Sequence, residues 1–254
     1  MDKMTFGGLA TGWILILSAF IMEGGEIVAL LQVTAAMIIL GGTVGAVFIA
    51  FPASDISRAM GMAKYIFMDA AKMDKDGLIR DLLDYATKAR KEGILCLEQY
   101  ANENPNPLLR KGLRLVVDGV EPERVKSILE NEIFMLENEY HVAANVFEQA
   151  GGYSPTMGII GTVLGLISVL SNLDDPSELG HKIALAFVAT FMGILFANIL
   201  WLPFANKLKI KGKNEAALNE IVMKGLISIQ EGENPRFIEE RLNSVLLKGM
   251  TGKS

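Results

Sequence analysis

The chain contains 254 residues, of which 51% are hydrophobic and 21% are charged, with a formal net charge of −5 and a mean hydropathy of +0.34. This composition is more apolar than that of a soluble domain, and the absence of a basic block argues against nucleic acid as a partner. A single cysteine, Cys96, excludes an internal disulfide framework, and the distant His141 and His181 do not suggest a metal site.

Two long apolar runs open the chain, at about residues 4–22 and 27–53, and only the sequence EGGE separates them. At about 1.5 Å per residue, each run is long enough to cross a hydrocarbon core about 30 Å thick. Residues 1–53 are therefore predicted to form a transmembrane hairpin.

Residues 54–153 contain most of the charges of the chain and show helical rather than strand periodicity. Apolar residues at helical spacing predict one helix over Asp76–Ala101, which ends at the prolines of NENPNP. A second long helix is predicted to begin near Glu121, with Pro122 in its first turn, and to end at a break at Gly151–Gly152.

Two further apolar runs, at about 154–173 and 183–204, form a second predicted transmembrane hairpin around a short acidic loop. Each run has one face of small residues at helical spacing, namely Gly158, Gly161 and Gly165 on the first and Ala186, Ala189, Gly193 and Ala197 on the second. Each of these stripes carries one threonine, Thr162 or Thr190. Small residues let helices approach closely in lipid, so the stripes fit packing alone as well as a surface around an ion path.

The tail, residues 205–254, begins with a ladder of lysines and predicts amphipathic helices at Glu215–Glu231 and Arg236–Leu247. Basic residues concentrate in 54–153 and in the tail, whereas the short loops between spans are acidic. The positive-inside rule then places both termini and the middle segment in the cytoplasm. We predict an all-α integral membrane protein with four transmembrane helices, a large helical cytoplasmic segment between the second and third spans, and a cytoplasmic C-terminal tail.

The four predicted spans contain no Asp, Glu, Lys, Arg or His. Ion carriers ordinarily keep an ionisable residue inside the membrane, so a proton that this protein moves has to be bound by a partner. No phosphate loop or nucleophile motif is present, and we predict neither enzymatic activity nor a cofactor. The charges of one segment fit either an exposed helix face or an electrostatic docking surface: Lys88, Arg90, Lys91, Glu92 and Glu98.

The stretch PTMGIIGTVLGLISVLSNLDDPSELGHKIALAFVATFMGILFANILWLPFANKL resembles the MotA/PomA family, the A subunits of the bacterial flagellar stator. The order of spans and cytoplasmic segments is also similar over the full length, and ATKARKEGILCLE resembles the segment of the family that faces the rotor. The resemblance implies a homopentamer of A subunits around two MotB-like B subunits, whose transmembrane Asp accepts the ion. Ion flow through this channel in the bacterial cytoplasmic (inner) membrane would rotate the A ring and exert torque on the rotor protein FliG.

The resemblance also assigns residues. Pro155 and Pro203 match family prolines that affect conformational coupling, and Thr162 and Thr190 match hydroxyl positions beside the ion path. The two small stripes would face the B helices. Rotor contact is implied for three charged positions: Arg90, Lys91 and Glu98.

At this point the sequence allows more than one coupling ion and more than one class of function. Family frequency favours protons, but the Thr162 hydroxyl could help replace the hydration shell of sodium, because hard cations take oxygen ligands. A TolQ/ExbB-like subunit that energises an envelope process is one alternative, although such proteins have fewer spans. A stand-alone ion channel is another, and it would need an ion site of its own.

Overall fold

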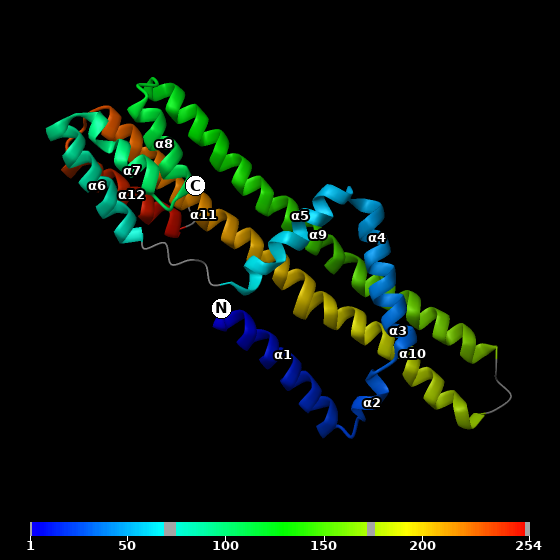
Figure 1. The fold of residues 1–254 in the computed structure, drawn as a ribbon. Coiled ribbons are helices and arrows are strands. Elements are labelled where there is room, and N and C mark those ends of the chain that lie inside the picture. Colours follow the sequence, from blue (N-terminus) through cyan, green and yellow to red (C-terminus); the bar gives the residue numbers. More distant parts are fainter. Residues whose placement is uncertain (1, 69–74, 172–175, 252–254) are drawn as a thin grey trace. The chain divides into compact units, whose positions relative to one another are not determined.

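The computed structural model describes residues 2–68, 75–171 and 176–251, and every regular element in these ranges is a helix (Figure 1). Two compact units are described separately below: the membrane unit, residues 1–69 and 140–209, and the core unit, residues 70–139 and 210–254. The two units are defined by packing, whereas the segments predicted from the sequence are defined by where the chain crosses the membrane. The boundaries of the units therefore differ from those of the predicted segments. The end of the third predicted span at 172–173 and the acidic loop at 174–175 lie outside the described residues.

Within the described ranges, four helical stretches are long and apolar enough to cross a membrane, which confirms the predicted fold class. The first is α1, Lys3–Met22, and the second extends over Ile27–Ala50. The third lies within α9, Pro122–Leu170, and the fourth within Lys182–Gln230. None of the residues of α1 is buried, so its apolar side chains are left to contact lipid or another subunit.

The second span is interrupted, although its sequence reads as one apolar run. Its elements are α2, Ile27–Leu30, α3, Val33–Ala36, the π-helical turn η1, Met37–Gly41, and α4, Gly42–Ala50, and α5, Ala53–Phe67, follows. Gln32, between α2 and α3, has an extended backbone with φ −103° and ψ 114°. Single π turns inside helices are frequent at functional sites, and this one follows the interruption at Gln32.

Helix α9 is continuous from Pro122 to Leu170, so the predicted break at Gly151–Gly152 is wrong. Each glycine destabilises a helix by roughly 1 kcal/mol relative to alanine, but here tertiary packing keeps the helix continuous. A Cβ at Gly151 would lie 2.6 Å from Leu202 Cδ2, so this glycine permits close contact with the opposite helix. Pro155 cannot donate to the carbonyl of Gly151, and the helix nevertheless continues through it.

The fourth span leads without a break into the tail: α10, Pro176–Phe196, is followed by the π turn η3, Ala197–Trp201, and by α11, Leu202–Gln230. The N–H of Leu202 donates to the carbonyl of Ala197, five residues back. The next residue, Pro203, has no N–H to donate, so the widened turn lies directly before the proline. The helix predicted over Glu215–Glu231 is therefore the end of a helix that begins inside the predicted fourth span.

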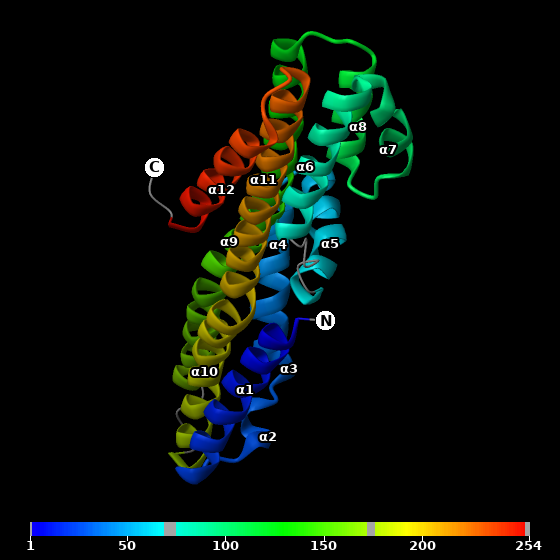
Figure 2. The same cartoon turned by 90° about the vertical axis from the view of Figure 1, so that its left-hand side faces the viewer.

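The core unit is a small helical bundle formed by the N-terminal part of α9, the C-terminal part of α11 and five shorter elements. These are α6, Lys75–Glu92, the 3-10 turn η2, Ile94–Leu97, α7, Glu98–Glu103, α8, Pro107–Val117, and α12, Pro235–Thr251. Figure 2 shows α12 turning back beside the end of α11, which agrees with the predicted helix at Arg236–Leu247. The interior of the core unit is built from fully buried leucines, among them Leu82, Leu113, Leu129 and Leu226.

The predicted single helix over Asp76–Ala101 is wrong, because α6 ends at Glu92. Gly93 has φ +86° and donates its N–H to the carbonyl of Ala89 at 2.9 Å. With ψ 162°, this backbone conformation is open essentially to glycine alone, and the α-helix ends here. After η2, α7 ends at Glu103, directly before the prolines that were predicted to stop a helix.

Candidate functional site

The small-residue stripes of the third and fourth spans face each other where α9 and α10 run side by side (Figures 1 and 2). A Cβ at Gly158 would lie 2.8 Å from the carbonyl oxygen of Ala189, and a Cβ at Gly193 would lie 2.7 Å from that of Ser154. Gly161 and Gly165 approach Ala189 and Ala186 in the same way. The helix backbones are thus in contact along this line, which we call the seam, while contact of the stripes with a B subunit stays a prediction.

The two threonines predicted from the stripes meet at the seam. Thr162 Oγ1 lies 2.5 Å from Thr190 Oγ1, and either hydroxyl can be the donor. The carbonyl oxygen of Ala186 lies 2.9 Å from Thr162 Oγ1, and that of Gly158 lies 3.3 Å from Thr190 Oγ1. Since each hydroxyl has one hydrogen, one threonine donates to the other, which in turn donates to a carbonyl. Hydroxyl and carbonyl oxygens therefore gather at one point between two helices, in an otherwise apolar part of the chain.

A third seam contact was missed from the sequence. The fully buried Ser154 donates its hydroxyl to the carbonyl of Gly193 at 2.9 Å. This bond crosses from α9 to α10, and it holds the helices together near the closest approach of Gly158 and Gly193. Serine at a small-residue interface is typical of helix packing in membranes, so its place at the start of the predicted third span was the available signal.

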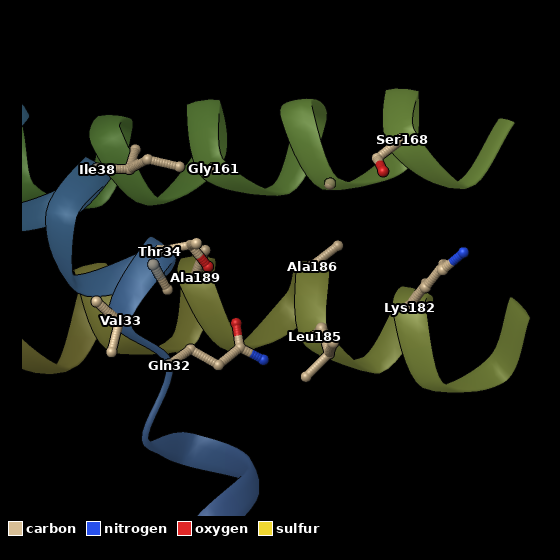
Figure 3. Close-up of a pocket in the computed structure, with 12 residues that line it drawn as sticks. Gln32, Val33, Thr34, Ile38, Gly161, Ser168, Lys182, Leu185, Ala186 and Ala189 are labelled. Carbon is tan, nitrogen blue, oxygen red and sulfur yellow. The ribbon is translucent and has the colours of Figure 1, made fainter. Parts of the chain in front are cut away.

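A cavity of about 410 Å³ opens beside the seam, and Figure 3 shows the residues that line it. Gly161 and Gly165 contribute from α9, Ala186 and Ala189 from α10, and the interrupted second span contributes Gln32, Val33, Thr34, Ala35 and Ile38. Gln32 Nε2 is buried and has no hydrogen-bond partner among the described residues. Lys182 reaches from α10 toward the space between the two helices. Residues of the two stripes therefore contact each other at the seam, and some of the same residues also line this cavity.

The chemistry of the seam is that of neutral oxygen ligands. No cluster of His, Cys, Asp or Glu that could hold a metal ion occurs in the ranges that the structure describes, and the predicted spans contain no carboxylate. Hydroxyls and carbonyls can line a path for a hard cation or for water, but they cannot take up and release a proton near neutral pH.

Both predicted coupling prolines lie inside continuous helices of the membrane unit. Pro155 is half-buried in α9, one residue after Ser154, and Pro203 is exposed in the first turn of α11, after the π turn η3. Each removes one backbone donor close to the seam or to a widened turn. Their part in conformational coupling remains a prediction.

The three predicted rotor charges lie at adjoining helix ends in the core unit. Arg90 and Lys91 belong to the last turn of α6, and Glu98 is the first residue of α7. All three side chains are exposed, and the described residues offer them no hydrogen bond or ion pair. Each charge has the sign that the dipole of its own helix favours at that end. The arrangement presents both signs of charge close together on the surface.

The N-terminus of α1 is fixed by an ion pair inside the membrane unit. Asp2 accepts from the N–H groups of Met4 and Thr5 as the N-cap of α1, and its carboxylate pairs with Lys207 of α11. The hydrogen bond from Lys207 lowers the pKa of Asp2 from its ordinary value of 3.8 to about 2. Asp2 is only 8% exposed, and its contact ties α1, which has no buried residue of its own, to α11 just after the fourth predicted span.

Comparison with known proteins gives consistent matches along the chain. Residues 6–93 match the family model described as motility protein A N-terminal, and residues 100–221 match the MotA/TolQ/ExbB proton channel family. The chain is 38% identical to motility protein A of Bacillus subtilis, with 95% of this chain and 90% of the relative covered. It is 34% identical to the chemotaxis protein PomA of Vibrio alginolyticus, with 98% of this chain and 97% of the relative covered. Its fold is similar to that of a chain of the flagellar MotAB stator complex from Bacillus subtilis, with a TM-score of 0.91, 36% identity, and 99% and 100% of the two chains covered.

Proposed function

The chain belongs to the motility protein A family, and we propose that it is the A subunit of a flagellar stator, which forms an ion channel with a B subunit. The observation that carries this proposal is the pair of hydroxyls, Thr162 and Thr190, in a seam without carboxylates. Such a seam can line an ion path and cannot itself exchange protons. A B subunit that supplies one carboxylate would complete the site.

Energy conversion follows from this division between subunits. An ion that moves down the membrane potential releases about 2.3 kcal/mol per elementary charge per 100 mV. Binding of the ion to the carboxylate of the B subunit removes its charge, and release restores it, so the contact with the seam oxygens changes at each step. In the proposed mechanism these changes move the ring of A subunits around the B subunits, without any chemical step catalysed by this chain.

We place the torque-transmitting contact at the ends of α6 and α7. The exposed Arg90, Lys91 and Glu98 support this, because they offer both signs of charge within a short segment. Electrostatic complementarity of this kind sets register and speed of contact more than raw affinity. The partner in this proposal is the rotor protein FliG.

The assembly is proposed to be a pentamer of this chain around two B subunits, in the bacterial inner membrane with both termini in the cytoplasm. The unburied α1 supports an oligomer, since it leaves apolar surface for contact with other chains. The distribution of basic residues supports the orientation.

The proposed coupling ion is the proton, and sodium is the alternative. The experiment compares swimming speed of cells that carry this protein and its B subunit, with and without sodium at constant membrane potential, for the parent and for Thr162→Ala. Sodium-independent swimming of both proteins supports a proton stator in which the Thr162 hydroxyl is structural. Sodium-dependent swimming that Thr162→Ala weakens would instead support sodium, with the hydroxyl as a ligand. An assembled complex that gives no motility in any medium would refute the stator function.

A further inference from the structure

Lys88 is held in a small side-chain cluster that joins α6 to α7. Its Nζ donates to Asp84 Oδ2 at 2.6 Å and to the hydroxyl oxygen of Tyr100 at 2.7 Å. The same Nζ lies 4.8 Å from the centroid of the Tyr100 ring, within the range of a cation–π contact. Lys88 therefore connects the C-terminal half of α6 directly to α7.

Tyr85 closes this cluster from the buried side. Its ring centroid lies 4.9 Å from that of Tyr100, and its hydroxyl accepts from Asn104 Nδ2 at 3.2 Å. Burial raises the pKa of Tyr85, and the hydrogen bonds with Asp84 and Tyr100 raise the pKa of Lys88. The tyrosine thus stays neutral and the lysine stays charged at physiological pH, so the cluster is complete under working conditions.

The residues of the cluster flank, in the sequence, the charges proposed to contact the rotor. Arg90 follows Lys88 by two residues on α6, and Glu98 precedes Tyr100 by two residues on α7. The backbone between the two helices consists of Gly93, with φ +86°, and the short turn η2. Buried Leu97 of η2 and Ala101 of α7 anchor this segment in the core. The Lys88–Tyr100 hydrogen bond adds a direct link between α6 and α7, which bears on where Glu98 lies relative to Arg90.

We propose that Lys88 is a positioning residue for the rotor contact: by linking Asp84 to Tyr100 it fixes α7 on α6, and so fixes the spacing of Glu98 from Arg90 and Lys91. The inference rests on the proposed function of those three charges. It gives Lys88 a different role from those three residues, although all four lie in one charged segment of the sequence. Two of the three N–H donors of Lys88 are already used, and the Asp84 carboxylate balances its charge.

The first test exchanges the charges of the pair. Lys88→Glu places two carboxylates one turn apart and is expected to reduce swimming. Adding Asp84→Lys restores an ion pair at the same i,i+4 spacing, and the Tyr100 hydroxyl can then donate to the carboxylate. We expect the double variant to recover swimming. If Lys88 contacted the rotor itself, the double variant would stay defective, because position 88 would still carry the wrong sign, and that result would overturn the proposal.

The second test measures geometry in the assembled complex with the B subunit. Spin labels at the exposed positions Glu92 and Gln99, in a Cys96→Ala background, report the spacing of α6 and α7 without replacing the rotor charges. Loss of one ordinary hydrogen bond lowers the ratio of docked to undocked α7 about fivefold. We therefore expect a broader distance distribution in Tyr100→Phe and Lys88→Met than in the parent. An unchanged distribution with reduced swimming would mean that Lys88 acts in another way.

A matched control lies on α11, where Lys224 donates to Glu220 at 3.2 Å with the same i,i+4 spacing. Lys224→Glu is expected to change neither swimming nor the distance distribution, so a general effect of charge reversal is separated from the effect at Lys88. Arg90→Glu tests the underlying function independently. If Arg90→Glu swims normally, the rotor contact itself is refuted, whereas a defect in Arg90→Glu without one in Lys88→Glu refutes only the positioning role.

Discussion

The substitution Gly158→Ala tests whether the seam depends on backbone contact between α9 and α10. The new Cβ would lie 2.8 Å from the carbonyl oxygen of Ala189 and 3.1 Å from Thr190 Cα. Both are backbone atoms that cannot rotate away, and ordinary contact begins at 3.4 Å, so the helices have to separate by about 0.6 Å or more. Overpacking of this kind typically costs about 1–3 kcal/mol.

We expect the purified complex with its B subunit to melt at a temperature lower by roughly 2–4 °C for each kcal/mol lost. Swimming is expected to decrease as well, since separation of the helices lengthens the Thr162–Thr190 contact. The control is Gly152→Ala on the same helix, where a Cβ meets nothing within 4 Å and helix propensity favours alanine by about 1 kcal/mol. Equal melting temperatures for the two variants would refute the argument from close packing.

Two further predictions concern other parts of the chain. The depressed pKa of Asp2 means that its ion pair with Lys207 stabilises the membrane unit fully above the ordinary pKa of 3.8, and that this contribution is lost as the pH falls through about 2. Asp2→Asn is expected to lower the melting temperature at neutral pH and to flatten its pH dependence over that range, and an unchanged pH profile would contradict this. Gly93→Ala forces a side chain into φ +86° and ψ 162°, which costs roughly 1–3 kcal/mol. Its melting temperature is expected to fall below that of Gly61→Ala, a glycine on α5 with ordinary backbone angles and open space around it.

The features that could be predicted from the sequence are those that depend on properties averaged over many residues. Four apolar runs gave four candidate spans, because length and composition alone decide whether a helix can cross a membrane. Helical spacing placed Thr162 and Thr190 each on a small-residue stripe, and the structure brings the two hydroxyls to 2.5 Å. The spacing could not show that the stripes contact each other, since a stripe on one helix does not identify the surface that covers it.

Glycine was the main source of wrong boundaries, because it serves opposite purposes at different places. Gly151 lies inside a continuous helix and leaves room for Leu202, whereas Gly93 follows the end of α6 with a positive φ. The signal for the second case was present in the sequence: Arg90 and Lys91 precede Gly93 as basic residues in a last turn. No such signal marks the interruption at Gln32, where an amide side chain in an apolar run was the only unusual feature.

At the seam, the presence of a threonine hydroxyl and the position at which it is held can be tested by different substitutions. The predicted spans contain no group that titrates near neutral pH, so the contribution of this chain to ion flow lies in where its oxygens are held. Thr162→Ser keeps the oxygen and the spacing of the helices, whereas Gly158→Ala keeps every hydroxyl and moves them apart. If position controls ion flow, the second variant impairs motility more than the first, even though it leaves both threonines in place.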